Sequence, residues 1–152
     1  MSLATEINNN LQEIKRLLYK IKCAFAEART FSFGAHVSGA PIATGFAITI
    51  IVPYDCRVIG WSVYEVSETP ISGEIYFSLQ HFPYADYATP LPAGTTMEGT
   101  DPPYLSAEVK RRNFLVTDWT VTTLTGGDVI QVLVMNATDV EEVKVLLHVT
   151  KL

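Results

Sequence analysis

The chain has 152 residues, of which 48% are hydrophobic and 18% are charged, and its net charge at pH 7 is -5. This length fits one domain of ordinary size plus an appendage, and the composition is too apolar for intrinsic disorder. The acidic balance argues against a nucleic-acid partner, because phosphate binding needs a concentrated basic face. We therefore interpret the one tight basic cluster, Lys110-Arg111-Arg112, as a solvated turn.

No apolar run reaches the roughly 18 to 20 residues needed to cross a bilayer, so we expect no membrane insertion. The N-terminus also lacks the pattern of a signal peptide, which implies synthesis in a cytoplasm. The two cysteines, Cys23 and Cys56, belong to different predicted elements and form no CxxC motif, so we expect free thiols. The mean hydropathy of +0.21 is high for a small monomer and indicates subunit contacts.

The first predicted element is a helix over residues 4–25, with Ser2 as its N-cap. Its apolar residues follow alternating steps of three and four, and polar residues surround this narrow stripe. In heptad register, leucine predominates at a and isoleucine at d, which favours three or four strands over two. We call this stripe the seam; its members are Ala4, Ile7, Leu11, Ile14, Leu18, Ile21 and Phe25. The alternative interpretation is a helix that packs along a neighbouring surface.

After residue 28 the hydrophobic period changes from 3.5 to 2, and turn residues recur. We therefore divide the chain into an N-terminal helix for oligomerisation or anchoring, residues 1–28, and a β-sandwich domain, residues 29–152. Candidate strands cover residues 30–37, 43–52, 57–67, 74–81, 113–124, 129–136 and 143–151. Seven or eight short antiparallel strands without an intervening helix predict a mainly β fold, a single jelly-roll-like sandwich.

Two of these strands, at 46–52 and 129–135, carry apolar residues on both faces. One face can pack on the opposing sheet, and a neighbouring subunit would cover the other. Together with the seam, this pattern predicts a homo-oligomer with a threefold or fourfold axis, of which the trimer is preferred.

One long irregular stretch, residues 81–105, contains five of the eight prolines. A loop of this length is seldom a mere connection, and tyrosine offers a large contact area with a polar tip. We expect either a binding surface or a subunit contact here, formed by Phe82, Tyr84, Tyr87 and Tyr104.

Catalytic and cofactor motifs are absent from the sequence. The histidines, His36, His81 and His148, lack a metal-binding spacing, and no serine lies in a GxSxG elbow. The acidic groups at 98–101 and 139–142 lack a calcium-loop spacing and are interpreted as solvated turns. Residues 126–128, Gly-Gly-Asp, lack the lysine of a phosphate loop and predict a hairpin turn. We expect no enzyme, no metal and no cofactor.

The layout resembles virion proteins of tailed bacteriophages that join a short N-terminal coil to a trimeric β-sandwich: head fibres, capsid decoration proteins and tail-fibre or baseplate heads. The resemblance rests on the heptad from Ile7 to Phe25, on IVPYDCRVIGW at residues 51–61, and on LTGGDVIQV at residues 124–132. It implies a non-enzymatic virion structural protein, homotrimeric, bound to capsid or tail proteins and in contact with a host glycan or receptor.

A second hypothesis is a carbohydrate- or receptor-binding lectin-like head. It would use the loop tyrosines, or Trp61 and Trp119 if these were exposed, although their positions within predicted strands favour the core. A third hypothesis, a glycan hydrolase, would need two carboxylates across a cleft.

Overall fold

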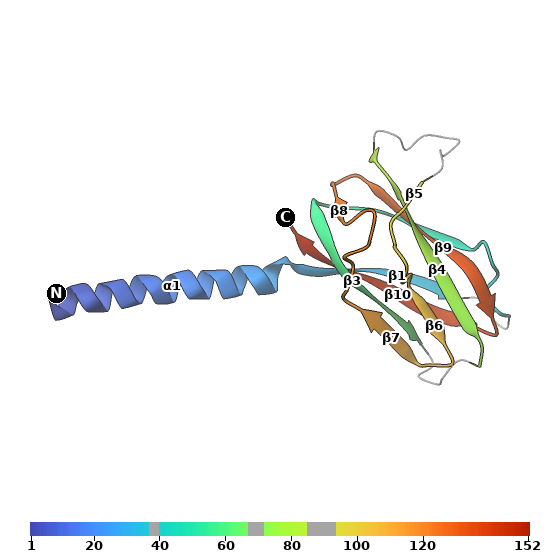
Figure 1. The fold of residues 1–152 in the computed structure, drawn as a ribbon, viewed down its shortest axis with the longest axis horizontal. Helices are drawn as coiled ribbons and strands as arrows, with labels where there is room; N and C mark the ends of the chain where they lie inside the picture. Colours follow the sequence, from blue (N-terminus) through green and yellow to red (C-terminus); the bar gives the residue numbers. More distant parts are fainter. Residues whose placement is uncertain (37–39, 67–71, 85–93) are drawn as a thin grey trace.

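The computed structural model describes residues 1–36, 40–66, 72–84 and 94–152. It is a mainly β protein with one long N-terminal helix that extends away from an antiparallel β-sandwich (Figure 1). The elements are α1 (Leu3–Glu27), β1 (Ala28–His36), β2 (Ala47–Ile51), β3 (Cys56–Glu65), β4 (Glu74–Phe82), β5 (Thr95–Thr96), β6 (Tyr104–Ser106), β7 (Lys110–Asn113), β8 (Thr123–Leu124), β9 (Val129–Thr138) and β10 (Glu142–Lys151).

Helix α1 begins where its N-cap was predicted. The Ser2 hydroxyl accepts a hydrogen bond from the Thr5 backbone N–H at 3.3 Å, which satisfies one of the unpaired donors of the first turn. Glu6 adds a negative charge to that turn, where it complements the helix dipole. Glu13 and Arg16 form an ion pair on the exposed surface of α1. The helix passes into β1 without a connecting loop, because Glu27 ends α1 and Ala28 begins β1.

Two five-stranded antiparallel sheets form the sandwich. Sheet A has the order β1-β10-β3-β7, with β8 also paired to β3, and sheet B has the order β2-β9-β4-β5, with β6 also paired to β4. The chain crosses between the sheets at β1 to β2, β2 to β3 and β3 to β4, and again after β6, β8 and β9. This order and these crossings are those of a jelly roll, in which two Greek keys pack face to face.

The core lies between the sheets and is built by the inward-facing residues of the longest strands. In β10, buried residues at 143, 145, 147 and 149 alternate with less buried ones, as the period of two predicts. Trp61, Phe33 and Phe77 are among the largest fully buried side chains. Trp61 and Trp119 are both buried, as the sequence analysis favoured, so neither indole is available to stack on a sugar.

The prediction of a strand over 113–124 is wrong. Strand β7 ends at Asn113, and regular structure resumes only at Thr123. The intervening segment bonds to another loop: the Asp118 carboxylate accepts hydrogen bonds from the N–H and hydroxyl of Thr100, and the Thr120 N–H donates to the Met97 carbonyl at 2.9 Å. The Thr120 contact uses a backbone donor that a strand would need for pairing.

The predicted irregular stretch at 81–105 and the predicted basic turn at 110–112 also need correction. The described part of the first contains β5 and the start of β6, both paired to β4, and the basic triplet forms most of β7. These strands have only two to four residues, too few for a readable alternation of side chains.

The turn predicted at 126–128 is present, with Gly127 at a φ of +98°, but it does not form a hairpin. Strand β8 before it belongs to sheet A and β9 after it belongs to sheet B, so the turn carries the chain across the sandwich. A two-residue glycine signal identifies a tight turn but does not reveal whether the flanking strands pair.

Candidate functional site

The seam lies along α1, and every one of its side chains that the structure describes is exposed. Ile7, Leu11, Ile14 and Leu18 keep between 46% and 59% of their surface accessible, and Ala4 is also exposed. Leu17 lies beside them and is equally open. Ile21 and Phe25 lie outside the residues whose side chains the structure describes. The five described seam residues therefore form an uncovered apolar stripe on α1, the helix that projects from the sandwich in Figure 1.

A second apolar area lies on the outer face of sheet B, the face turned away from sheet A. In β2, Ile48 and Ile50 pack against the core, so Ala47 and Ile51 point outward, and Ile51 is 69% exposed. In β9, Leu133 pairs with Ala47 and is half-buried, and Met135 is exposed. We call Ala47, Ile51, Leu133 and Met135 the outer patch; the pair Thr49 and Gln131 lies on the same face, between Ile51 and the other three. It is the side of the two-sided apolar strands that the chain leaves partly open.

The predicted loop residues separate into strand and loop positions. Phe82 is the buried last residue of β4, and Tyr104 lies in β6, stacked on Tyr76 with ring centroids 5.2 Å apart. Tyr84 follows β4 and is 73% exposed. Tyr87 lies outside the described residues. Of the four aromatics, Tyr84 alone is thus placed as a freely accessible ring among the described positions.

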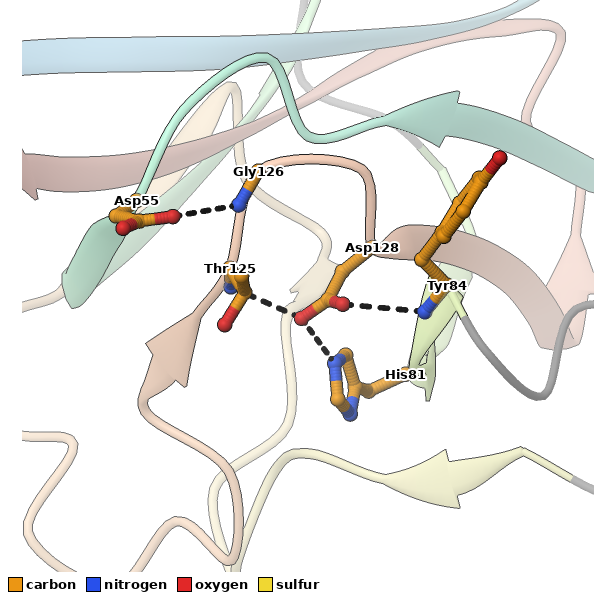
Figure 2. Close-up of polar contacts among 6 residues, drawn as sticks. All are labelled: Asp55, His81, Tyr84, Thr125, Gly126 and Asp128. Atoms are coloured by element: carbon orange, nitrogen blue, oxygen red, sulfur yellow. Dashed lines mark hydrogen bonds and ion pairs between the residues drawn. The ribbon is translucent and has the colours of Figure 1, made fainter.

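Beneath Tyr84 lies a polar cluster centred on Asp128 (Figure 2). His81 Nε2 is 2.8 Å from Asp128 Oδ2, and the same oxygen accepts the Thr125 N–H at 2.9 Å. Asp128 Oδ1 accepts the Tyr84 N–H at 3.2 Å. A single buried carboxylate therefore joins the end of β4 to the turn between β8 and β9.

Neighbouring backbone contacts extend this cluster to the β2–β3 connection. Asp55 Oδ1 accepts the Gly126 N–H at 2.8 Å, and Val52 exchanges hydrogen bonds with the turn through the Gly127 N–H and the Asp128 carbonyl. Burial opposes ionisation of Asp128, but the hydrogen bonds from His81 and from two backbone N–H groups outweigh it, so the pKa of Asp128 lies below its ordinary value. The charged, acceptor-only carboxylate is the form that fits these donors.

The chemistry of this cluster is structural. A hydrolytic site needs a nucleophile within hydrogen-bond reach of the histidine, and the partner that the structure gives to His81 is Asp128. Cys56 lies nearby but is fully buried, and burial, followed by the charges of Asp55 and Asp128, raises the pKa of its thiol to about 11. The cluster fixes one end of the sandwich and holds the backbone from which Tyr84 projects.

Sequence reasoning missed the pairing of His81 with Asp128, because 47 residues separate them. One signal was available: His81 continues the inward series of Ile75, Phe77 and Leu79 in β4, and a polar residue at an inward position needs a buried partner. His148, in β10, also has a polar partner: its Nε2 lies 2.7 Å from the Ser62 hydroxyl.

The acidic residues at 98–101 do not simply lie in a solvated turn, because both make hydrogen bonds within the protein. Glu98 accepts the Leu79 N–H at 2.8 Å, and Asp101 bonds to the Asn113 side chain. These two carboxylates thus hold the loops at 97–101 to β4 and β7. Within the described ranges, no group of three or more His, Cys, Asp or Glu residues is arranged to hold a metal ion. Among the described helical residues, none form a segment long and apolar enough to cross a membrane.

The fold and the exposed surfaces define the class of the molecule as an antiparallel jelly-roll sandwich with a projecting apolar helix. A scan against protein-family models and a search of curated proteins find no match. Among solved structures, the capsid of Ralstonia phage GP4 aligns with a TM-score of 0.47 and 12% identity, over 82% of this chain and 84% of that chain.

Two further structures align over the same 82% of this chain. One is infectious bursal disease virus, Gx strain, with a TM-score of 0.30, 14% identity and 30% of that chain covered. The other is dTDP-4-dehydrorhamnose 3,5-epimerase from Bacillus anthracis, with a TM-score of 0.27, 11% identity and 53% of that chain covered. With TM-scores below 0.5 and such low identities, these likenesses assign no function to this chain.

Proposed function

We propose that the chain is a non-enzymatic virion structural protein, a homotrimer in which the seam forms a three-stranded coil and the sandwiches form a knob. The knob is attached to a phage capsid or tail and contacts other virion proteins, with a host-surface glycan or receptor as a further partner. The observation that carries this proposal is the exposed a/d seam on a helix that its own sandwich does not cover.

The energetic argument begins with solvent exposure. Each described isoleucine or leucine of the seam retains about half of its surface, and completing the burial of such a side chain stabilises by roughly 1 kcal/mol. Most of the stability of a helix in a protein comes from packing of its apolar face and little from intrinsic propensity, so apolar contacts would stabilise α1. Copies of the same helix supply a complementary stripe in register, and leucine at a with isoleucine at d favours three or four strands.

The outer patch supports the same assembly from a separate part of the chain. Ile51 and Met135 are large exposed apolar side chains on sheet B, and a contact between neighbouring sandwiches would bury them. A coil that holds three sandwiches at high local concentration makes such a contact favourable even if it is weak alone. The sandwich would then supply assembly energy that the short seam lacks.

The virion assignment rests on the resemblance of the chain to coil-and-sandwich phage proteins and on the jelly-roll strand order. Viral capsid and lectin domains are recurrent users of that architecture, so this step is an analogy of fold. Two experiments test it. Mass measurement in solution should give three chains per particle, and a monomer at micromolar concentration with α1 intact would contradict the trimer. Imaging of virions that contain this chain should show a knob with threefold symmetry on the head or the tail.

A lectin-like head is the second candidate, and Tyr84 favours it. Its ring is exposed, while the backbone behind it is fixed by Asp128. An aromatic ring on a rigid support is suited to recognition, because little entropy is lost on binding. Screening the intact chain against a glycan array, with Tyr84→Ala as the variant, tests this role; an array without signal would remove it.

A further inference from the structure

The basic residues of sheet A gather on one side, although the chain as a whole is acidic. Because side chains alternate along a strand, residues 57, 62 and 64 of β3 point away from the buried positions 56, 58, 61 and 63. Antiparallel pairing places Lys110 and Lys144 on either side of Tyr64, and it places Arg112 beside Ser62. The outer face of sheet A therefore carries Arg57, Lys110, Arg112 and Lys144. We call these four residues the basic face.

None of the ion pairs given between described residues involves a member of the basic face. The ion pairs given for the described residues join other groups: Arg16 with Glu13, Arg111 with Glu108, and His81 with Asp128. Two acidic residues lie near the basic face. Glu142 shares it and Glu65 is buried at its margin, and both already have interactions of their own. The basic face thus gathers four cations on one side of a chain whose net charge is -5.

The surface beside the basic face is hollowed. A hollow of about 830 Å³ adjoins β3 and β7, within the size range of ligand sites in proteins. Its lining residues are Ser62, Val63, Tyr64, Glu65, Val109, Lys110, Arg111 and Arg112. Arg111 is engaged, since its guanidinium lies 3.9 Å from the centre of the Tyr104 ring. Lys110 and Arg112 are exposed and point to the outer side.

Aromatic rings accompany these cations. Phe114 is half-exposed and stacks on His148, with centroids 5.1 Å apart, and Arg112 lies 6.0 Å from its ring. Gly60 makes this arrangement possible, because a Cβ atom there would lie 2.5 Å from the Phe114 ring. Tyr64 adds a phenol between two lysines. The face combines cations, hydroxyl groups and apolar ring surface.

We propose that the basic face binds an acidic polysaccharide, whose carboxylate or phosphate groups lie among Lys110, Arg112 and Lys144. Arginine and lysine are the residues that hold such anions, and a tyrosine presents both an apolar ring and a hydroxyl to a sugar. The backbone positions of Lys110 and Arg112 along β7 are about 6.6 Å apart, and those of Lys110 and Lys144, on either side of β3, are about 9.6 Å apart. An extended, flexible polysaccharide with about one negative charge per sugar can place its charges against basic residues at these spacings. The inference is independent of the trimer.

The test uses the full chain and three immobilised polysaccharides: polygalacturonate for carboxylate, a phosphomannan for phosphate, and neutral dextran. We expect binding to one or both acidic polymers and none to dextran; the two acidic arms identify the anion. The variant Lys110→Gln with Arg112→Gln should weaken binding about tenfold or more, and its dependence on salt should fall by about two ion equivalents.

The control variant, Arg16→Gln with Lys151→Gln, removes the same charge from positions outside the basic face. The affinity of this control for the acidic polymers should stay within about twofold of that of the unaltered chain, because all four residues of the basic face are still present. Equal losses in the two variants, binding to neither acidic polymer, or tighter binding to duplex DNA through the same residues would overturn the proposal. Measuring the mass of each sample in solution distinguishes failure of the binding proposal from failure of the trimer proposal. A monomer that still binds the acidic polymers would contradict only the trimer.

Discussion

Replacing Ile14 with aspartate tests the seam at its centre. Ile14 lies at a d position and is about half exposed in the single chain, so a coil would remove the remaining surface from water. The four described isoleucine and leucine residues of the seam would together contribute about 4 kcal/mol per helix on burial, at roughly 1 kcal/mol each. Three helices give about 12 kcal/mol, which offsets part of the cost of the two association steps that join three chains, at about 4–15 kcal/mol per step.

The substitution Ile14→Asp removes about 1 kcal/mol of apolar burial from each chain and introduces an unpaired carboxylate. Burying such a charge costs several kcal/mol per chain, and a trimer contains three copies close to one axis. The expected result is a fall in mass from three chains to one at micromolar concentration. Light scattering coupled to size exclusion measures it, and circular dichroism shows whether the sandwich remains folded.

The matched control is Gln12→Asp, which changes the charge by the same amount at an exposed b position. It should leave the trimer intact, because a b residue faces solvent in a coil. An unchanged mass for Ile14→Asp would refute the seam as an oligomer contact. Equal dissociation of both variants would show that added negative charge, and not the d position, is responsible.

The remaining predictions concern the sandwich. A Cβ atom at Gly73 would lie 1.8 Å from the Thr138 carbonyl oxygen, so Gly73→Ala should lower the free energy of unfolding, measured by urea titration, by about 1–3 kcal/mol or more. The control Gly34→Ala should not destabilise, because a Cβ atom at Gly34 meets nothing closer than 4.0 Å. Equal stabilities of the two variants would contradict the packing at Gly73. Because folding lowers the pKa of Asp128 from 3.8, the carboxylate stabilises the folded chain fully above pH 3.8, and this stabilisation declines as the pH falls through the folded-state pKa. Asp128→Asn should lower the free energy of unfolding by about 1–3 kcal/mol at pH 7 and make that free energy depend less on pH in acid. If the variant keeps the pH dependence of the unaltered chain, the Asp128 cluster is not its source. The Cys56 thiol, with its pKa raised to about 11, should resist alkylation at pH 8 until the chain unfolds, and rapid modification located by peptide mass analysis would contradict its burial.

Local patterns in the sequence predicted the long elements well. The 3.5-residue period and the Ser2 cap predicted a helix that occupies Leu3–Glu27, and alternation predicted β3, β4 and β10 to within a few residues. Such patterns succeed because each side chain's face depends only on its neighbours along the chain. They failed at the two- to four-residue strands β5, β6, β7 and β8, whose hydrogen bonds depend on where distant segments pass.

The exposed surfaces likewise separate into those that the local sequence predicts and those that depend on the tertiary structure. The sequence by itself determined the seam, because an amphipathic helix carries its apolar stripe in the order of its own residues. Only the tertiary structure decided that Lys110 and Lys144 share a face, or that His81 meets Asp128, because strand register brings together residues 34 and 47 positions apart. A net charge of -5 concealed the basic face for the same reason. Composition sums charges over the whole chain, whereas folding places them on particular sides of a sheet.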